Sequence, residues 1–160
     1  MKPEETFDYH VRAVWYAIFR MYNQVGQQYG VTTSMGFVLL NIHSEEGTPA
    51  TKIAPLMGLE TRSLSRMLRS LEDKGLIYRV KDDVDRRSVR IFLTEEGKRK
   101  KEIARQTVRQ FNEEVQQLID PADMAAYFRV MNQVSEFINE RSLKNNQNKA
   151  TNNKKTLKPI

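Results

Sequence analysis

The residues with the most distinctive chemistry in this sequence form a short polar turn and the alternating strand that follows it, over residues 83–97. Asp85 and Arg87 stand two residues apart in the turn, so the carboxylate can hold the guanidinium in one orientation through charge-assisted hydrogen bonds. An arginine held in this way at a hairpin tip suits a narrow groove of strongly negative potential. We expect the neighbouring Arg86 and Arg90 to meet phosphates; the alternative is a salt bridge that only shapes the turn.

A helix-turn-helix pattern lies directly upstream, over residues 49–75. Thr48 followed by Pro49 is typical of a helix start, with the threonine as N-cap. Pro55 lies beyond the first turn of this helix, where it removes a hydrogen bond, so we expect a short or bent helix. Gly75 ends the second helix. A helix-turn-helix followed by a basic hairpin is typical of a winged domain whose second helix enters a DNA major groove.

The second helix of this pattern has an exposed face rich in hydrogen-bond donors. Arg62, Arg66 and Arg69 are spaced four and three residues apart, so they share one helix face. Because arginine can fork onto guanine, we predict that Arg62 and Arg66 read bases. A solvated face, with Arg69 paired to Glu72 or Asp73, is the alternative. Arg69, Ser63 and Ser65 are predicted to position this helix on the DNA, and Thr61 belongs to the same exposed face. Early in the first helix, Thr51 and Lys52 are predicted to contact the phosphate backbone.

The remaining chain is mainly helical, with a small β-hairpin as the wing. Apolar residues recur every three or four positions over about residues 5–29, and further helices are expected over about 34–43, 95–119 and 122–141. Two strands are expected at 76–81 and 88–93. The resulting organisation is one winged helix-turn-helix domain over residues 5–141. Its wing is at about 76–94, and its N- and C-terminal dimerisation helices are at about 5–29 and 95–141.

The terminal helices carry more apolar surface than one winged domain needs for its own core. A homodimer built from both ends of the chain would bury this surface. The alternative is that the terminal helices pack on their own winged domain. The residues predicted for the dimer interface are Phe7, Val11, Phe128, Met131, Phe137 and Ile138.

Basic charge is concentrated in two parts of the 160-residue chain, whose net charge is +6. Residues 48–101 carry 14 basic and 8 acidic side chains, whereas the segments on either side of them, up to residue 141, are mildly acidic. This pattern favours a polyanion bound at one face. Residues 142–160 hold five lysines, five asparagines and no acid, so we expect a disordered basic tail.

Enzyme function is poorly supported by the sequence. The chain has no cysteine and only two histidines, His10 and His43; His10 has no metal-type ligand three or four residues away, and His43 has only Glu46, which is too few ligands for a metal site. We see no glycine-rich phosphate loop and no nucleophile with a base, so we expect neither catalysis nor a cofactor nor a metal. No apolar run is long enough to span a membrane, and the first residues are not typical of a signal peptide. We expect a cytoplasmic, nucleoid-associated protein.

Together these motifs resemble the MarR (multiple antibiotic resistance) family of winged helix-turn-helix regulators. The resemblance covers about residues 7–138 and is carried by Ile53–Leu59, Ser63–Leu68, Leu71–Ile77, Asp85–Ser88 and Leu93–Gly97. It implies a homodimer on a pseudo-palindromic operator, usually repressing nearby genes, with base reading by Thr61–Arg69 and a wing arginine at Arg87. Two departures stand out: Pro55 replaces a helix former, and the lack of cysteine excludes a thiol-oxidation switch.

The resemblance also implies a ligand site between the dimerisation helices and the winged domain. A small aromatic or phenolic effector would relieve DNA binding there, and the candidate residues are Tyr9, His10, Trp15, Tyr16 and Phe37. Aromatic residues at helical spacing are more often core residues. A ligand-independent DNA-binding activator or architectural protein is the second reading. The sequence does not give the operator, the effector, the regulated genes or the sign of regulation.

Overall fold

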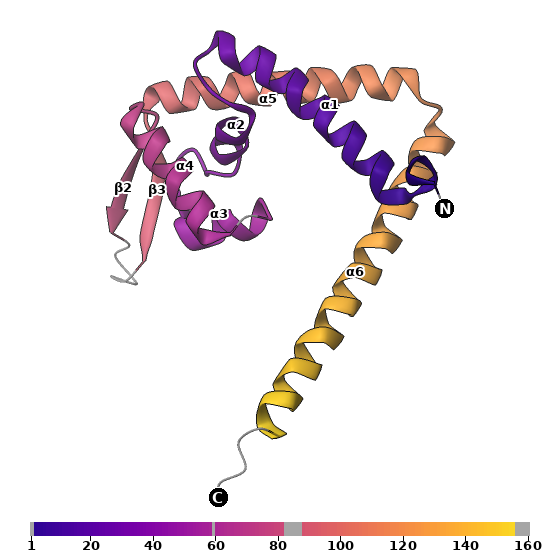
Figure 1. Ribbon diagram of the computed structural model, residues 1–160. Coiled ribbons are helices and arrows are strands. Elements are labelled where there is room, and N and C mark those ends of the chain that lie inside the picture. Colours follow the sequence, from indigo (N-terminus) through magenta and orange to yellow (C-terminus); the bar gives the residue numbers. More distant parts are fainter. Residues whose placement is uncertain (1, 59, 82–87, 156–160) are drawn as a thin grey trace, which may run out of the picture. The chain divides into compact units, whose positions relative to one another are not determined.

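Residues 2–58, 60–81 and 88–155 are described by the computed structural model, with side chains up to Lys144. The chain divides into two units, Met1–Phe111 and Asn112–Ile160. Helix α5, Glu95–Leu118, contributes residues to both. In Figure 1 the first unit contains the helix-turn-helix and its sheet, and the second contains the end of α5 and helix α6.

The first unit begins with a 3-10 turn and two helices that precede the helix-turn-helix. Thr32 starts the second of these helices, because its hydroxyl accepts a hydrogen bond from the Met35 amide. Gly30, at φ 71°, ends the first helix in the left-handed conformation expected of it. The elements are η1 (Pro3–Glu5), α1 (Phe7–Gln28), α2 (Thr33–Leu40), β1 (Thr48–Pro49), α3 (Ala50–Leu56), α4 (Thr61–Asp73), β2 (Ile77–Lys81) and β3 (Val89–Leu93).

The strands form a three-stranded antiparallel sheet in the order β1-β3-β2. Ile77 pairs with Leu93, and Arg79 pairs with Ile91, so the buried side chains of β2 and β3 lie on the same face. That face packs on α2, α3 and α4, which together supply most of the hydrophobic core. The predicted fold class, mainly helical with a small β wing, is confirmed, and the sheet has one strand more than the predicted hairpin.

Thr48 does not have the role that the sequence predicted for it. We expected it to cap α3, but it lies in β1 opposite Ile91, and α3 begins after Pro49. The Thr48 hydroxyl accepts a hydrogen bond from the His43 amide at 2.8 Å and donates to the Asn41 carbonyl at 3.3 Å. Pairing with a strand far along the chain therefore overrides the local helix-start signal. Helix α3 has 7 residues with Pro55 inside it, in agreement with the predicted short helix.

The second unit is dominated by α6, Pro121–Lys155. Its start agrees with the helix expected from about residue 122, and the Asp120 carboxylate caps it by accepting a hydrogen bond from the Ala122 amide at 2.8 Å. Its end differs from the prediction, which placed it near Arg141 and expected a disordered segment after it. The backbone is helical through Lys155, and the sequence contains neither glycine nor proline between Pro121 and Lys155 to interrupt it.

Candidate nucleic-acid interface

Helix α4 separates its apolar and basic residues onto opposite faces. Leu64, Leu68 and Leu71 are buried in the core, and Leu71 is 0% exposed. Arg62, Arg66 and Arg69, together with Thr61, Ser63 and Ser65, are exposed. The leucines anchor the helix on α2, α3 and the sheet, and the arginines project from the side that the core leaves free.

The arginines of α4 are not neutralised by neighbouring acids. Among the residues that the structure describes, no hydrogen bond or ion pair involves Arg62, Arg66 or Arg69. The expected alternative partner, Glu72, instead accepts from Arg79 of β2 at 2.9 Å. The three guanidiniums therefore keep their donors available for phosphates or base edges, which is the requirement for a reading helix.

The hydroxyl groups of Ser63 and Ser65 on α4 and of Thr51 on α3 differ in their hydrogen bonding. Ser65 donates its hydroxyl hydrogen to the Thr61 carbonyl at 2.9 Å, within the helix, so it is left with acceptor capacity only. Ser63 is exposed on the same helix. Thr51 and Lys52 are exposed near the start of α3, where they can reach a phosphate backbone.

The wing residues Asp85, Arg86 and Arg87 lie outside the described residues. The strands that carry the wing are described, and Arg90 lies on β3 close to it. Its guanidinium donates to the Glu46 carbonyl at 3.2 Å, in the loop before β1. Arg90 was expected to meet phosphate, and in this structure its guanidinium is engaged with the protein.

A cleft of about 410 Å³ lies between α3, α4 and the strands that lead to the wing. Polar groups from all three elements line it, including Thr51, Ser65 and Arg79. The sequence did not predict this cleft, because its walls come from segments far apart in the chain. It lies beside the exposed face of α4, and so belongs to the same candidate interface.

The basic run Lys98–Lys101 at the start of α5 is largely paired within the protein. Lys98 approaches Glu95 at 3.0 Å and Arg99 approaches Glu96 at 2.5 Å. These hydrogen bonds raise the pKa of Lys98 and lower the pKa of Glu96. Lys98 and Arg99 are therefore largely neutralised locally, and the contribution of this run to an anion-binding surface is smaller than its sequence suggests.

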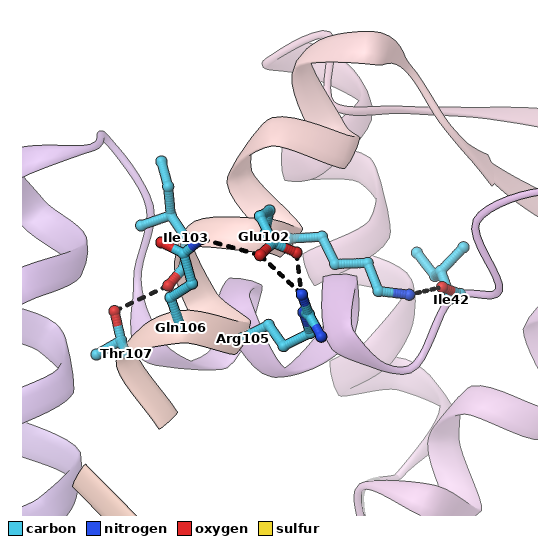
Figure 2. Close-up of polar contacts among 7 residues, drawn as sticks. Ile42, Glu102, Ile103, Arg105, Gln106 and Thr107 are labelled. Atoms are coloured by element: carbon cyan, nitrogen blue, oxygen red, sulfur yellow. Dashed lines mark hydrogen bonds and ion pairs between the residues drawn. The ribbon is translucent and has the colours of Figure 1, made fainter. Parts of the chain in front are cut away.

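Lys101 has a different role from its neighbours. Its ammonium donates a hydrogen bond to the Ile42 carbonyl, just beyond α2, at 2.5 Å. Figure 2 draws this contact at the labelled Ile42. Burial lowers the pKa of Lys101, and the nearby Arg105 adds to that effect. The next residue of α5, Glu102, accepts hydrogen bonds from Arg105 and Gln106, one turn further along the helix (Figure 2). These contacts tie α5 to the end of α2 and order the polar side of α5.

An apolar cavity of about 40 Å³, the inner cavity, lies between α1, α2 and α5 within the first unit. Of the predicted ligand residues only Phe37 lines it; Tyr9, His10, Trp15 and Tyr16 do not. Trp15 stacks on Phe37 with ring centroids 6.0 Å apart. The other lining residues are Tyr22, Val25, Gly26, Tyr29, Val31, Thr32, Thr33, Gly36, Leu40, Lys100, Ile103, Ala104, Thr107 and Val108.

The side of this cavity that α5 forms was not predicted from the sequence. The signal for it was the spacing of Lys100, Ala104 and Thr107, which places them on one face of the helix. Their side chains are chemically unlike one another, so the pattern does not stand out as a site. The position of His10 is explained by its own contact, a 2.8 Å hydrogen bond with the Glu4 carbonyl.

The residues predicted for a dimer interface are largely solvent-exposed in the single chain. Phe7 and Val11 are exposed on α1 of the first unit, and Met131 is half-buried on α6. On α6 of the second unit Phe128 and Phe137 are 55% and 59% exposed, and Ile138 is also exposed. Large apolar side chains exposed to solvent in this way are typical of an interaction surface.

Within the ranges 2–58, 60–81 and 88–155, no three metal-ligating side chains come together. None of the helices in these ranges combines the length and apolarity needed to cross a membrane.

The amino-acid sequence of this chain is similar to that of known DNA-binding regulators. Residues 31–89, from the end of α1 to β3, match the sequence model of the MarR family. The regulator SarZ of Staphylococcus aureus (strain USA300) is 31% identical over 97 residues, which are 60% of this chain and 66% of SarZ. The match therefore spans just under two thirds of that relative.

Solved structures show the same fold at lower identity. The S. aureus MepR–DNA complex aligns with a TM-score of 0.75 at 23% identity, covering 81% of this chain and 96% of MepR. CouR from Rhodococcus jostii RHA1, bound to p-coumaroyl-CoA, aligns with a TM-score of 0.69 at 22% identity, covering 83% of this chain and 93% of CouR. The chain therefore resembles the MarR family in sequence over residues 31–89, and it shares the fold of these solved structures.

Proposed function

We propose that this chain is a homodimeric transcriptional regulator that binds a pseudo-palindromic double-stranded operator and represses nearby genes. The observation that carries the proposal is the division of α4 into a buried leucine face and an exposed arginine face. An anchored helix with three available guanidiniums supplies both the orientation and the donors that base reading needs. Its relatives SarZ and MepR, a named regulator and a protein solved with DNA, support this reading. Such a regulator would act in the cytoplasm, on the nucleoid.

The contacts divide into base reading and positioning. Arg62 and Arg66, nearer the N-terminal end of α4, read base edges in the major groove. Arg69, Thr61, Ser63 and Ser65 position the helix, and Thr51 and Lys52 contact phosphates. Arg87, oriented by Asp85, enters the adjacent minor groove, and Arg86 and Arg90 contact phosphates beside it. For Arg90 this requires the guanidinium to leave or share the Glu46 carbonyl.

Dimerisation supplies the second reading helix. The exposed apolar residues of α1 and α6 give each chain a surface that a second copy can cover. A two-fold axis then sets two α4 helices about 34 Å apart, one turn of DNA. A monomer would hold only one half-site and would lose most of its affinity.

A small aromatic or phenolic effector releases this dimer from DNA. The inner cavity supports the idea because Tyr22 and Phe37 present aromatic rings to it. At about 40 Å³ the cavity has room for little more than one water, so an effector must separate α1, α2 and α5 to enter. An effector lowers the affinity for DNA only if it binds the conformation with α1, α2 and α5 separated more tightly than it binds the DNA-bound conformation.

A ligand-independent activator or architectural protein is the alternative function. Both readings share α4 and the wing, so the sequence preference and the response to effectors distinguish them. An architectural protein would bind many duplexes with similar affinity and a steep salt dependence. A repressor would prefer one operator by orders of magnitude.

The proposal is tested by selecting bound duplexes from a random pool with the purified protein. We expect enrichment of a pseudo-palindrome with half-sites about 10 bp apart. The double variant Arg62→Ala, Arg66→Ala should lose enrichment at the positions that these arginines read, whereas Lys98→Ala, already paired with Glu95, should keep it. A reporter gene carrying the selected site then gives the sign of regulation. An unenriched pool would contradict the regulator and favour the architectural alternative.

A further inference from the structure

Helix α6 changes in composition at Ser142, although its backbone continues as a helix to Lys155 (yellow in Figure 1). Before Ser142 its apolar residues recur every three or four positions. From Ser142 to Lys155 the only apolar residues are Leu143 and Ala150, and Leu143 is 62% exposed. The sequence therefore gives the last part of this helix almost no apolar surface to bury.

Ion pairs within this part of the chain cannot stabilise the helix either. The basic tail, residues 142–160, carries five lysines, five asparagines and no acid. Like charges on one helix repel each other, and asparagine is a weak helix former. A helix that is polar on every side and carries one sign of charge is stabilised by a partner of the opposite charge.

The spacing of the lysines indicates what kind of partner this is. Lys144, Lys149 and Lys154 follow one another in steps of five residues, which place successive residues on different sides of a helix. A flat acidic patch on a protein would meet only one of these sides. A polyanion with a dense atmosphere of charge attracts lysines on all of them, because no fixed contact geometry is needed.

The acids nearest the tail in sequence are too few to neutralise it. Residues 102–141 carry 7 acidic and 4 basic side chains. Glu102 already accepts hydrogen bonds from its own helix, and Asp120 caps α6. Glu113 and Glu114 also have partners. The acids that remain are fewer than the lysines of the tail, so the counter-charge comes from another molecule.

We propose that the basic tail is a second, sequence-independent DNA contact, whose lysines neutralise backbone phosphates of the duplex that α4 reads. This inference rests on the proposed function, which brings duplex DNA to the protein. Duplex DNA carries one negative charge per about 1.7 Å of its axis, and each lysine held beside it releases a condensed counterion. Lysine acts there as a point charge and reads no bases.

The two contacts of the chain then have different consequences for binding. The tail raises the affinity for every duplex by a similar factor, whereas α4 sets the preference for one sequence. A dimer brings two tails to one duplex, so their contribution is doubled in each complex. Because counterion release drives it, this contribution falls steeply as the salt concentration rises.

A full-length variant without the five charges tests this inference. Glutamine keeps the length of the tail and is a good helix former, so charge is the property that changes. Fluorescence anisotropy on the selected operator and on a scrambled duplex, between about 50 and 200 mM salt, measures affinity and salt dependence. This five-glutamine variant carries Lys144→Gln, Lys149→Gln, Lys154→Gln, Lys155→Gln and Lys158→Gln.

The five-glutamine variant should bind both duplexes about tenfold or more weakly at low salt, with the preference for the operator unchanged. The slope of log affinity against log salt should become shallower by about 0.9 for each lysine that lies on the duplex. Arginine at the same five positions keeps the charge and should restore wild-type binding. A second control replaces the asparagines and should leave the salt slope unchanged: Asn145→Gln, Asn146→Gln, Asn148→Gln, Asn152→Gln and Asn153→Gln.

The inference is overturned if the five-glutamine variant keeps the wild-type affinity and salt slope, or if the asparagine control loses as much. It is also overturned if sedimentation velocity shows that the five-glutamine variant no longer dimerises, because the lysines would then pair with acids of the protein. If the variant behaves as the wild type and both prefer the operator, the tail contact is wrong and the proposed function stands. If the wild-type protein binds both duplexes alike and the variant binds both more weakly, the tail contact is right and sequence reading is wrong.

Discussion

The Thr94 hydroxyl donates a 2.7 Å hydrogen bond to the Gly75 carbonyl and accepts one from the Gly97 amide at 3.0 Å. Thr94 therefore links the end of the reading helix α4 to the start of α5. One side chain both caps α5 and fixes the point at which β3 leaves the sheet. The spacing between α4 and α5 depends on this contact.

Replacement of Thr94 by valine should lower the free energy of unfolding by about 1–2 kcal/mol, because both hydrogen bonds are lost. Urea denaturation measures this change. Thr107→Val is the matched control, since the Thr107 hydroxyl bonds only to the Ile103 carbonyl of its own helix. Equal losses for the two variants would contradict the linking role of Thr94.

Gly97 is required by the close approach of two backbones. A Cβ atom at Gly97 would lie 1.9 Å from the Leu76 carbonyl oxygen, whereas a Cβ at Gly36 would meet Ala104 at an ordinary 3.6 Å. Gly97→Ala should therefore destabilise the protein by about 1–3 kcal/mol, and Gly36→Ala should be tolerated. Thermal unfolding of both variants distinguishes them, and a neutral Gly97→Ala would contradict the packing.

The pKa of Glu102 should lie below its usual range, because its carboxylate accepts hydrogen bonds from Arg105 and Gln106. A lowered folded-state pKa gives stability that is present above the unfolded value and is lost as the pH falls through the folded value. NMR titration of the carboxyl group should show the lowered pKa, and Arg105→Gln should raise it. An unchanged titration in Arg105→Gln would contradict the contact drawn in Figure 2.

Dimerisation is expected to depend on the apolar face of α6. Phe137→Glu places a charge where Phe137 is 59% exposed, and should weaken self-association about tenfold or more. Sedimentation velocity measures the oligomeric state. Glu136→Gln changes the charge of α6 by one unit on the side of the helix away from Phe128, Met131 and Ile138, and should leave the dimer intact. A monomeric wild-type protein would contradict the dimer at once.

Much of the fold follows from local sequence signals. Gly75 ends α4 as predicted, and the arginines of α4 share one exposed face as their spacing predicted, because both signals are short-range patterns. Thr48 was wrongly assigned because its partner, Ile91, lies far along the chain. Local propensity cannot reveal a strand pairing that tertiary contacts impose.

The sites were predictable to different degrees. The arginines of α4 could be recognised because one helix sets their spacing. The inner cavity could not, since Tyr29 and Val31 line it from one part of the chain and Ile103 and Ala104 from another. The end of α6 was misjudged because composition favoured disorder, while no helix-breaking residue marks a boundary before Lys155.

Fluorescence anisotropy with the selected operator and a scrambled duplex, at two salt concentrations, tests most directly whether α4 reads sequence. The wild-type protein should prefer the operator by about a thousandfold or more. Arg66→Ala should cost about 1–3 kcal/mol on the operator and little on the scrambled duplex, whereas Arg87→Ala should weaken both. The unfolding transition of Arg66→Ala should match that of the wild-type protein, because the Arg66 side chain is exposed. Equal binding to the two duplexes, or an equal loss on both in Arg66→Ala, would contradict base reading by α4.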